Sequence, residues 1–331
     1  MIGLFLFINS CNVTYLMIFV IILTIFVLRE IISITKTPQG YPLPIYLIVG
    51  FTTNIYIYYL SDSLSYLYPS LSNCLIIHSK TYFYNCVIFM IIFVCSLKKG
   101  LLKRQFALFS LIHLASYLVA NSCRAALVNL HIGKFWLFFP STLVICNDIF
   151  AYIIGKSLGH TPLFKLSPKK TVEGFIGGFV FTFLYGFIFC FIQSKYTLFV
   201  DLYSKELQDI WKFVFYGVTV QIKYMYIHCL CFVLVASFVA PFSGFFASAL
   251  KRAYNKKDFG NSIPGHGGLT DRFDCQCIMV LFTTVYLKSF LRTKEQTLEG
   301  CYFHITRSFS GDEISLLISM LEKFQLGQVE N

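Results

Sequence analysis

The stretch Gly174-Phe-Ile-Gly-Gly-Phe-Val-Phe-Thr-Phe-Leu-Tyr-Gly-Phe-Ile-Phe-Cys-Phe-Ile192 decides the class of fold, because none of its residues carries a charge. An α-helix needs roughly 20 apolar residues to cross the hydrocarbon core of a bilayer. A helix on the surface of a soluble protein would instead have one apolar and one polar face. The sequence therefore predicts a membrane-spanning helix at about 174–192.

The rest of the chain has the same character. Of its 331 residues, 56% are hydrophobic and only 13% are charged, whereas soluble proteins carry about 25% charged residues. We predict an all-α fold, a polytopic membrane helix bundle with about eight transmembrane helices. The seven further spans are expected at about 15–33, 42–60, 82–97, 105–121, 135–155, 226–249 and 275–291.

Neither the N-terminus nor the cysteines indicate a different class of protein. The chain begins without the basic segment of a signal peptide, so its first apolar run is interpreted as a membrane span. Most of the 12 cysteines lie inside apolar runs, and no Cys-x-x-Cys pair occurs. This pattern favours cysteine as a small apolar residue over a zinc site or a disulfide framework.

Positive charge is concentrated in three loops between the predicted spans, and the net charge is +11. These loops run from Lys98 to Arg104, from Lys156 to Lys170 and from Lys251 to Arg272. Cytosolic loops of membrane proteins are typically basic, and two predicted spans separate each of these loops from the next. One topology therefore places all three in the cytosol. The charge also fits an anionic lipid or a phosphorylated substrate, whereas nucleic acid is not expected, because no basic soluble domain is predicted.

The last of these loops carries the strongest chemical signal. It reads Ser248-Ala-Leu-Lys-Arg-Ala-Tyr-Asn-Lys-Lys-Asp-Phe-Gly-Asn-Ser-Ile-Pro-Gly-His-Gly-Gly-Leu-Thr-Asp-Arg-Phe-Asp274. A cluster of cations is followed by a glycine-rich turn, whose backbone N–H groups can approach an anion closely. Asp271 and Asp274 then share one face if the next segment is helical, which suits Mg²⁺ carrying nucleotide phosphates. Each feature alone has a simpler explanation: the cations as an anchor at the membrane interface, the glycines as an ordinary turn, and Asp271 with Arg272 as a surface ion pair.

A second segment lies at the mouth of the sixth span. Ser167-Pro-Lys-Lys-Thr171 supplies two ammonium groups and two hydroxyls, and Thr171 is expected to cap the helix that follows. A helix N-terminus with adjacent lysines binds phosphate well, although a plain cap and anchor would have the same residues. Asp148 is unusual in another way, because an ionised carboxylate in an apolar span is costly unless it is paired or binds a metal.

The stretch from Ser248 to Asp274 resembles the signature of the phosphatidate cytidylyltransferases, also called CDP-diacylglycerol synthases. That pattern is Ser-x-apolar-Lys-Arg, then Lys-Asp, then Pro-x-His-Gly-Gly-apolar-x-Asp-Arg-x-Asp, and every fixed position is present. The segment from Cys146 to Gly178 resembles the second characteristic region of eukaryotic members. Bacterial members place an Asp where this chain has Gly244 and a Glu where it has Ala247, so their metal site does not transfer whole.

The resemblance implies a domain organisation and a reaction. Residues 1–97 would form N-terminal transmembrane helices, residues 98–292 a catalytic transmembrane domain with cytosolic loops at 156–173 and 251–274, and residues 293–331 a soluble C-terminal tail. CTP and phosphatidic acid would give CDP-diacylglycerol and pyrophosphate in phospholipid biosynthesis. The implied setting is the endoplasmic reticulum, and a homodimer is compatible with the sequence.

The resemblance also assigns roles within the two loops, with Mg²⁺ as the cofactor. The expected catalytic residues are Lys170, Lys251, Arg252, Asp258 and Arg272. The expected substrate-binding residues are Ser167, Lys169, Lys170, Thr171, His266, Gly267 and Gly268. The expected metal ligands are Asp271, with Asp148, Asp258 or Asp274 as its partner.

Two alternatives remain open at this point. A CTP-using lipid kinase of the dolichol kinase type would share the membrane setting and the nucleotide, but it would release CDP rather than pyrophosphate. A transporter would use Asp148 as a buried coupling residue. Transporters concentrate ionisable residues near mid-membrane, often in paired repeats, whereas here such residues are concentrated in two loops and no repeat is visible.

Overall fold

The computed structural model describes residues 12–36, 43–67, 72–164, 167–196, 210–215, 218–262, 267–290, 302, 305–306 and 309–329. The chain divides into two compact units, Met1–Thr284 and Val285–Asn331. The helices of the first unit are α2 (Val13–Ile34), α3 (Ile45–Leu67), α4 (Ser72–Cys95), α5 (Leu102–Ile132), α6 (Phe135–Leu158), α7 (Val172–Tyr196), α8 (Tyr224–Leu234), α9 (Ala240–Ala253) and most of α10 (Thr270–Phe290). The second unit contains α12 (Gly311–Val329).

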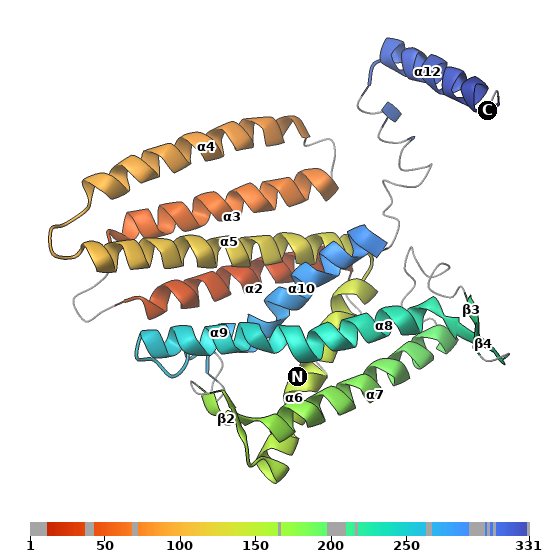
Figure 1. Ribbon diagram of the computed structural model, residues 1–331. Coiled ribbons are helices and arrows are strands. Elements are labelled where there is room, and N and C mark those ends of the chain that lie inside the picture. Colours follow the sequence, from red (N-terminus) through yellow and green to blue (C-terminus); the bar gives the residue numbers. More distant parts are fainter. Residues whose placement is uncertain are drawn as a thin grey trace. The chain divides into compact units, whose positions relative to one another are not determined.

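The helices of the first unit pack side by side as a bundle (Figure 1). One group is formed by α2, α3, α4 and α5, in which α3 packs against both α4 and α5 and α2 packs against α5. In the other group α6 packs along α7, and α7 packs against α8. A described helix lies on each of the predicted spans. The prediction of a helical membrane bundle is therefore confirmed.

Within the described part of the chain, five helices are long and apolar enough to cross a membrane. They are α2, α5, α6, α7 and the continuous segment Tyr224–Ala253. Their outer faces are apolar as well, since Ile18, Ile22 and Ile25 on α2 are each about half exposed. Exposed aliphatic side chains in such number suit a surface that faces lipid.

Two of the predicted spans differ from the structure in instructive ways. The fourth was predicted to end near residue 121, but α5 continues to Ile132. Two polar residues in this extension are bonded to neighbouring helices: the Asn129 amide donates to the Val280 carbonyl at 3.0 Å, and Arg124 pairs with Asp62 of α3. The seventh span contains a π-helical turn, η3 (Val235–Val239), between α8 and α9.

Two short antiparallel hairpins were not predicted. Strands β1 (Pro162–Phe164) and β2 (Ser167–Thr171) lie between α6 and α7, and strands β3 (Ile210–Phe215) and β4 (Val218–Lys223) precede α8. In the first hairpin Pro162 is paired with Thr171, and Phe164 with Ser167. The basic loop 156–173 is therefore partly folded, and this hairpin delivers Lys170 to the site described next.

Candidate active site

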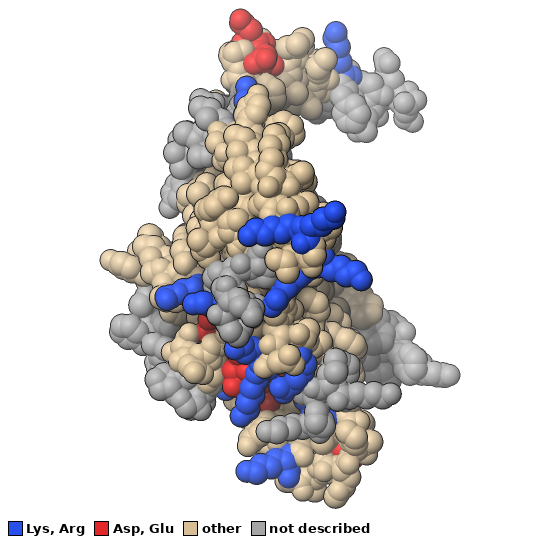
Figure 2. Space-filling model, turned by 90° about the vertical axis from the view of Figure 1, so that its left-hand side faces the viewer, with Lys and Arg blue, Asp and Glu red and all other residues tan. Residues whose placement is uncertain are grey.

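Basic side chains gather at one end of the first unit. The connection between α4 and α5 and the end of α9 lie on the same side in Figure 1. Figure 2, which views that side, shows Lys and Arg side chains around a few acidic ones. Burial raises the pKa of Tyr254, at the end of α9, and nearby Arg104 acts in the opposite direction. The end of α9 and the first turn of α5 thus lie on the same side of the bundle and within electrostatic range, as expected from the predicted topology.

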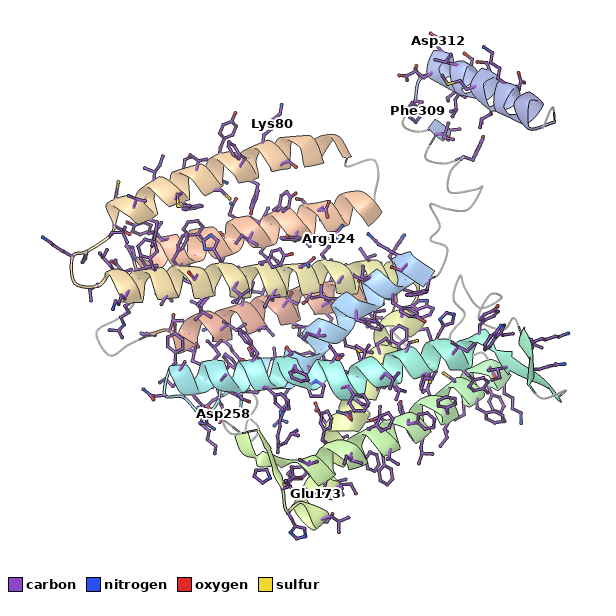
Figure 3. The ribbon with its side chains drawn as sticks, viewed as in Figure 1. Lys80, Arg124, Glu173, Asp258, Phe309 and Asp312 are labelled. Carbon is purple, nitrogen blue, oxygen red and sulfur yellow. The ribbon has the colours of Figure 1, made fainter. Side chains whose placement is uncertain are left out.

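The hairpin between α6 and α7 is fixed by hydrogen bonds at the start of α7. The Thr171 hydroxyl accepts from the backbone N–H of Gly174 at 3.2 Å, so the predicted cap is confirmed. Glu173 accepts from the backbone N–H groups of His160 and Thr161, each at 3.1 Å. Figure 3 places Glu173 at this end of α7. These bonds hold β2 against both helices, and with it Lys170.

Lys170 and Asp274 meet next to Gly244. The Lys170 ammonium nitrogen lies 4.4 Å from the centroid of the Phe245 ring, a cation–π contact. A Cβ at Gly244 would lie 3.3 Å from that nitrogen and 3.4 Å from Asp274 Oδ2. The glycine at this position therefore leaves the space in which a lysine from β2 and a carboxylate from α10 approach each other.

Asp148 joins the same cluster from α6. Its carboxylate lies within electrostatic range of Asp274, Lys170 and Arg272, and its side chain is exposed. The neighbouring Asn147 has a different surrounding, because it is buried and its amide oxygen accepts from Thr182 on α7 at 3.5 Å. Asp148 is thus an acid within electrostatic range of two cations, whereas Asn147 contributes to helix packing.

Asp271 has protein partners for both of its oxygens. Lys251 pairs with Oδ1, and the backbone N–H groups of Phe259 and Gly268 donate to Oδ2 at 3.0 and 3.1 Å. The side chains of Asp271 and Lys251 are 10% and 13% exposed. In this structure both oxygens of Asp271 are therefore occupied in tying the end of α9, the loop and the start of α10 together. Its partner Lys251 lies within electrostatic range of Asp274.

Gly267 and Gly268, the two glycines of the turn, are each required by the structure for a different reason. Gly267 has φ of +84°, a left-handed conformation that other residues adopt only with strain. A Cβ at Gly268 would lie 2.8 Å from the backbone nitrogen of Gly260 and 2.9 Å from Asp271 Oδ2. The N–H of Gly268 is engaged by Asp271, so in this structure it is not free to bind a phosphate.

The other predicted residues lie at the end of α9, in the loop after it, in β2 or outside the described part of the chain. Arg252 is exposed and donates to the Lys256 carbonyl at 3.3 Å. Asp258 is also exposed, and it lies beside the end of α9 in Figure 3. Ser167 and Lys169 belong to β2, of which the structure describes the backbone at these positions. His266 lies outside the described residues.

One acidic residue that contacts the signature loop was not predicted from the sequence. Glu30 of α2 is 6% exposed and accepts hydrogen bonds from Ser262, Leu269 and Thr270. An acid within an apolar run was the available signal, the same one that singled out Asp148. That signal does not show which distant segment of the chain such an acid contacts.

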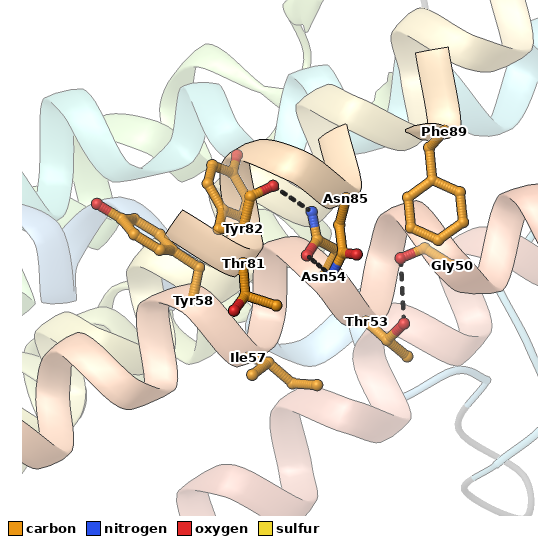
Figure 4. A pocket seen from close by; sticks show the side chains of 9 residues that line it. All are labelled: Gly50, Thr53, Asn54, Ile57, Tyr58, Thr81, Tyr82, Asn85 and Phe89. Atoms are coloured by element: carbon orange, nitrogen blue, oxygen red, sulfur yellow. Dashed lines mark hydrogen bonds between the residues drawn. The ribbon is translucent and has the colours of Figure 1, made fainter. Parts of the chain in front are cut away.

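A cavity of about 310 Å³ lies between α3 and α4 (Figure 4). Its polar groups bond to one another: the Asn85 amide donates to Asn54 Oδ1 at 3.2 Å, and the Asn54 amide donates to the Tyr82 carbonyl at 3.4 Å. None of the residues that line it is charged. It is therefore unsuited to a phosphorylated ligand, and the charged cluster is the better candidate site.

The cluster has the composition needed to bind a polyanion together with Mg²⁺. Mg²⁺ is commonly held by one or two carboxylates, with water and substrate phosphates completing the coordination. Asp148 and Asp274 are two carboxylates within electrostatic range of each other. The described residues contain no group of three or more His, Cys, Asp or Glu side chains able to hold a metal. Lys170 and Arg272 add positive charge beside them.

A helical membrane bundle with this cluster defines a multi-pass membrane protein whose site is suited to phosphate esters. The chain belongs to the cytidylyltransferase family, whose model matches residues 1–290.

Relatives from several eukaryotes agree with this membership. The chain is 46% identical to the phosphatidate cytidylyltransferase of Encephalitozoon cuniculi, over 92% of this chain and 78% of that protein. It is 36% identical to the enzyme of the same name from Saccharomyces cerevisiae, over 88% of this chain and 68% of that protein. It is 34% identical to phosphatidate cytidylyltransferase 1 of Arabidopsis thaliana, over 97% and 84% of the two chains. The predicted family is therefore confirmed.

Proposed function

We propose that this protein is a CTP:phosphatidate cytidylyltransferase, which converts CTP and phosphatidic acid into CDP-diacylglycerol and pyrophosphate. The observation that carries the proposal is the approach of Lys170 from β2 and Asp274 from α10 beside Gly244. Asp148 of α6 and Arg272 of α10 lie within electrostatic range of this pair. Both characteristic sequence regions contribute to this one cluster. Family membership and the names of the relatives supply the substrates.

The reaction needs charge neutralisation more than a strong base. An oxygen of the phosphatidate phosphate forms a bond to the α-phosphorus of CTP, and the bond from that phosphorus to the bridging oxygen breaks, releasing pyrophosphate. The second pKa of a phosphomonoester is about 6, so the nucleophile is largely ionised near neutral pH. The difficulty is to bring two polyanions together, and positioned cations reduce their repulsion.

Lys170 and Arg272 are proposed to bind the phosphates at the point of transfer. Lys170 is the better placed for the nucleotide, because β2 and the Phe245 ring fix its position. Exposed Arg252, with the lysines around it, would attract the lipid phosphate or the leaving pyrophosphate. Lys251 would act indirectly, by holding Asp271.

Mg²⁺ is proposed as the cofactor, held by Asp148 and Asp274. When bound, it would neutralise charge on the nucleotide phosphates. Asp271 would become a further ligand only if Lys251 left its carboxylate. The two remaining acids differ in position, since Asp148 is exposed and Asp274 is partly buried beside Gly244.

The finer features of the chain are proposals as well. We infer eight membrane spans, the five longest apolar helices together with α3, α4 and α10. The basic loops would face the cytosol, residues 98–292 would form the catalytic domain and residues 293–331 a soluble tail. The endoplasmic reticulum is the proposed location, and a homodimer is the proposed assembly.

The decisive experiment uses purified protein, CTP labelled at the α-phosphate and phosphatidic acid in mixed micelles, with and without Mg²⁺. Label appearing in CDP-diacylglycerol, with pyrophosphate in equal amount, would support the proposal. Release of CDP with a phosphorylated lipid would instead identify a lipid kinase. The variant Asp148→Asn serves as the control for contaminating activity, because it should form little product.

A further inference from the structure

Glu30 is a carboxylate in a position where a carboxylate is costly. It lies in the apolar helix α2 and is 6% exposed. Burial of an ionised carboxylate is unfavourable unless hydrogen bonds or a counter-charge compensate it. Glu30 is also close to the C-terminal end of its helix, where the helix dipole disfavours negative charge. The rest of the structure must therefore offset both costs.

The compensation comes from the beginning of another helix. Oε1 of Glu30 accepts from the Leu269 N–H at 2.9 Å and from the Ser262 hydroxyl, and Oε2 accepts from the Thr270 N–H at 2.8 Å. Thr270 is the first residue of α10. The first N–H groups of a helix have no partner within it, and the helix dipole favours an anion there. Glu30 thus caps the start of α10, although it belongs to a different helix.

The fit around this carboxylate is close. A Cβ at Gly260 would lie 3.0 Å from Glu30 Oε1, and one at Gly268 would lie 2.8 Å from Oε2. A second link runs between the same helices, because the Thr270 hydroxyl donates to the Val27 carbonyl at 3.4 Å. The described parts of the signature loop, up to Ser262 and from Gly267, therefore pack around the Glu30 carboxylate, and Gly260 and Gly268 make room for that group.

The anchored segment leads directly into the candidate active site. Arg272 and Asp274 follow Thr270 within the first turn and a half of α10, and they supply half of the charged cluster. An error of about 1 Å in the position of a catalytic group can lower a rate about 100-fold. A residue that fixes the start of α10 therefore has a strong effect on the cluster without touching it.

We propose that Glu30 is a positioning residue, which anchors the signature loop and the start of α10 so that Arg272 and Asp274 meet Asp148 and Lys170. The inference rests on the proposed cytidylyl transfer for its kinetic part. It places α2 within the catalytic unit, in contrast to the predicted division at residue 97.

The test compares Glu30→Gln, Glu30→Asp and the wild type as full-length purified proteins. In Glu30→Gln an NH₂ group replaces one carboxylate oxygen. That group cannot accept a hydrogen bond from Ser262, Leu269 or Thr270. Its kcat should fall at least tenfold, while the KM for phosphatidic acid stays within twofold. Glu30→Asp keeps the charge and should regain part of the loss. The control is Arg29→Gln, an exposed neighbour on the same helix, which should behave as wild type.

Hydrogen–deuterium exchange, measured without substrates, supplies a readout that does not depend on activity. Glu30→Gln should increase exchange in peptides covering 259–274 and leave α6 and α7 unchanged. Wild-type kcat in Glu30→Gln would overturn the proposal, and so would a uniform rise in exchange over the whole chain, which indicates a general role in stability.

A milder variant covers the case in which Glu30→Gln does not fold. Ser262→Ala removes one donor to the carboxylate, and it should raise exchange in the same peptides and lower kcat about twofold or more. Wild-type values for both would overturn the proposal. If the wild type itself makes no CDP-diacylglycerol, the proposed function fails, whereas the exchange data still decide whether Glu30 anchors α10.

Discussion

Lys251, in the last turn of α9, forms an ion pair with Asp271, in the first turn of α10. Both belong to the sequence signature, in which they lie 20 residues apart. The pair closes the loop between the two helices, and the backbone N–H groups of Phe259 and Gly268 complete the surroundings of the carboxylate. Two signature residues that were expected to contact substrate or metal are therefore bonded to each other.

The first prediction concerns this pair. Asp271→Asn should lower activity about 100-fold, because the start of α10, which carries Arg272 and Asp274, loses an anchor. It should also lower the thermal unfolding temperature, because the mostly buried Lys251 loses its counter-charge. The double variant Lys251→Met with Asp271→Asn should recover stability relative to Asp271→Asn, while it remains inactive. The measurements are turnover and thermal unfolding in detergent. A double variant no more stable than the single one would contradict a coupled pair.

Asp148 and Asp274 are predicted to act as a unit. Asp148→Asn and Asp274→Asn should each reduce activity about 100-fold and raise the Mg²⁺ concentration needed for half-maximal rate. The double variant should be little worse than either one, because groups that act together are non-additive. Titration of activity with Mg²⁺ checks this. The exposed Asp312 on α12 provides the control variant Asp312→Asn, which should titrate as wild type. Unchanged Mg²⁺ dependence in both single variants would count against a shared metal.

Lys170 is predicted to bind the nucleotide. Lys170→Met keeps much of the side-chain length but removes the charge, so the KM for CTP should rise at least tenfold. The matched control is Lys156→Met, an exposed lysine in the last turn of α6. The KM for CTP of both variants should be measured by steady-state kinetics at saturating phosphatidic acid. If both substitutions change the KM for CTP equally, the general positive charge of this end is responsible rather than Lys170.

Gly268→Ala should lower both stability and activity. The added Cβ would lie 2.8 Å from Glu30 Oε2 and from the backbone nitrogen of Gly260, and backbone cannot move aside cheaply. Gly311→Ala is the control, because a Cβ there meets nothing within 4 Å. Thermal unfolding and CTP kinetics should be measured on both. Weaker CTP binding at unchanged stability would instead support the expectation from the sequence that Gly268 binds substrate.

The positions of the helices could be predicted because a bilayer selects long apolar runs, as at 174–192. Their ends could not be predicted where polar residues continue a helix, since the bonds from Asn129 to Val280 and from Arg124 to Asp62 join segments distant in sequence. For the same reason the sequence signature predicted which residues belong to the site, but it did not predict which of them bond to one another. The pairing of Lys251 with Asp271 depends on how α9 and α10 converge, which no local pattern contains.

The position of Glu30 also has a consequence for the order in which the chain enters the membrane. Its hydrogen-bond partners Ser262, Leu269 and Thr270 lie 232 to 240 residues further along the chain. During synthesis α2 therefore emerges long before these partners, which follow the helices α3 to α9. A carboxylate in an apolar helix is costly without its partners, so an incomplete chain carries this cost. Docking of α10 supplies the partners and brings Arg272 and Asp274 into place in the same event, so we expect a chain without α10 to be inactive.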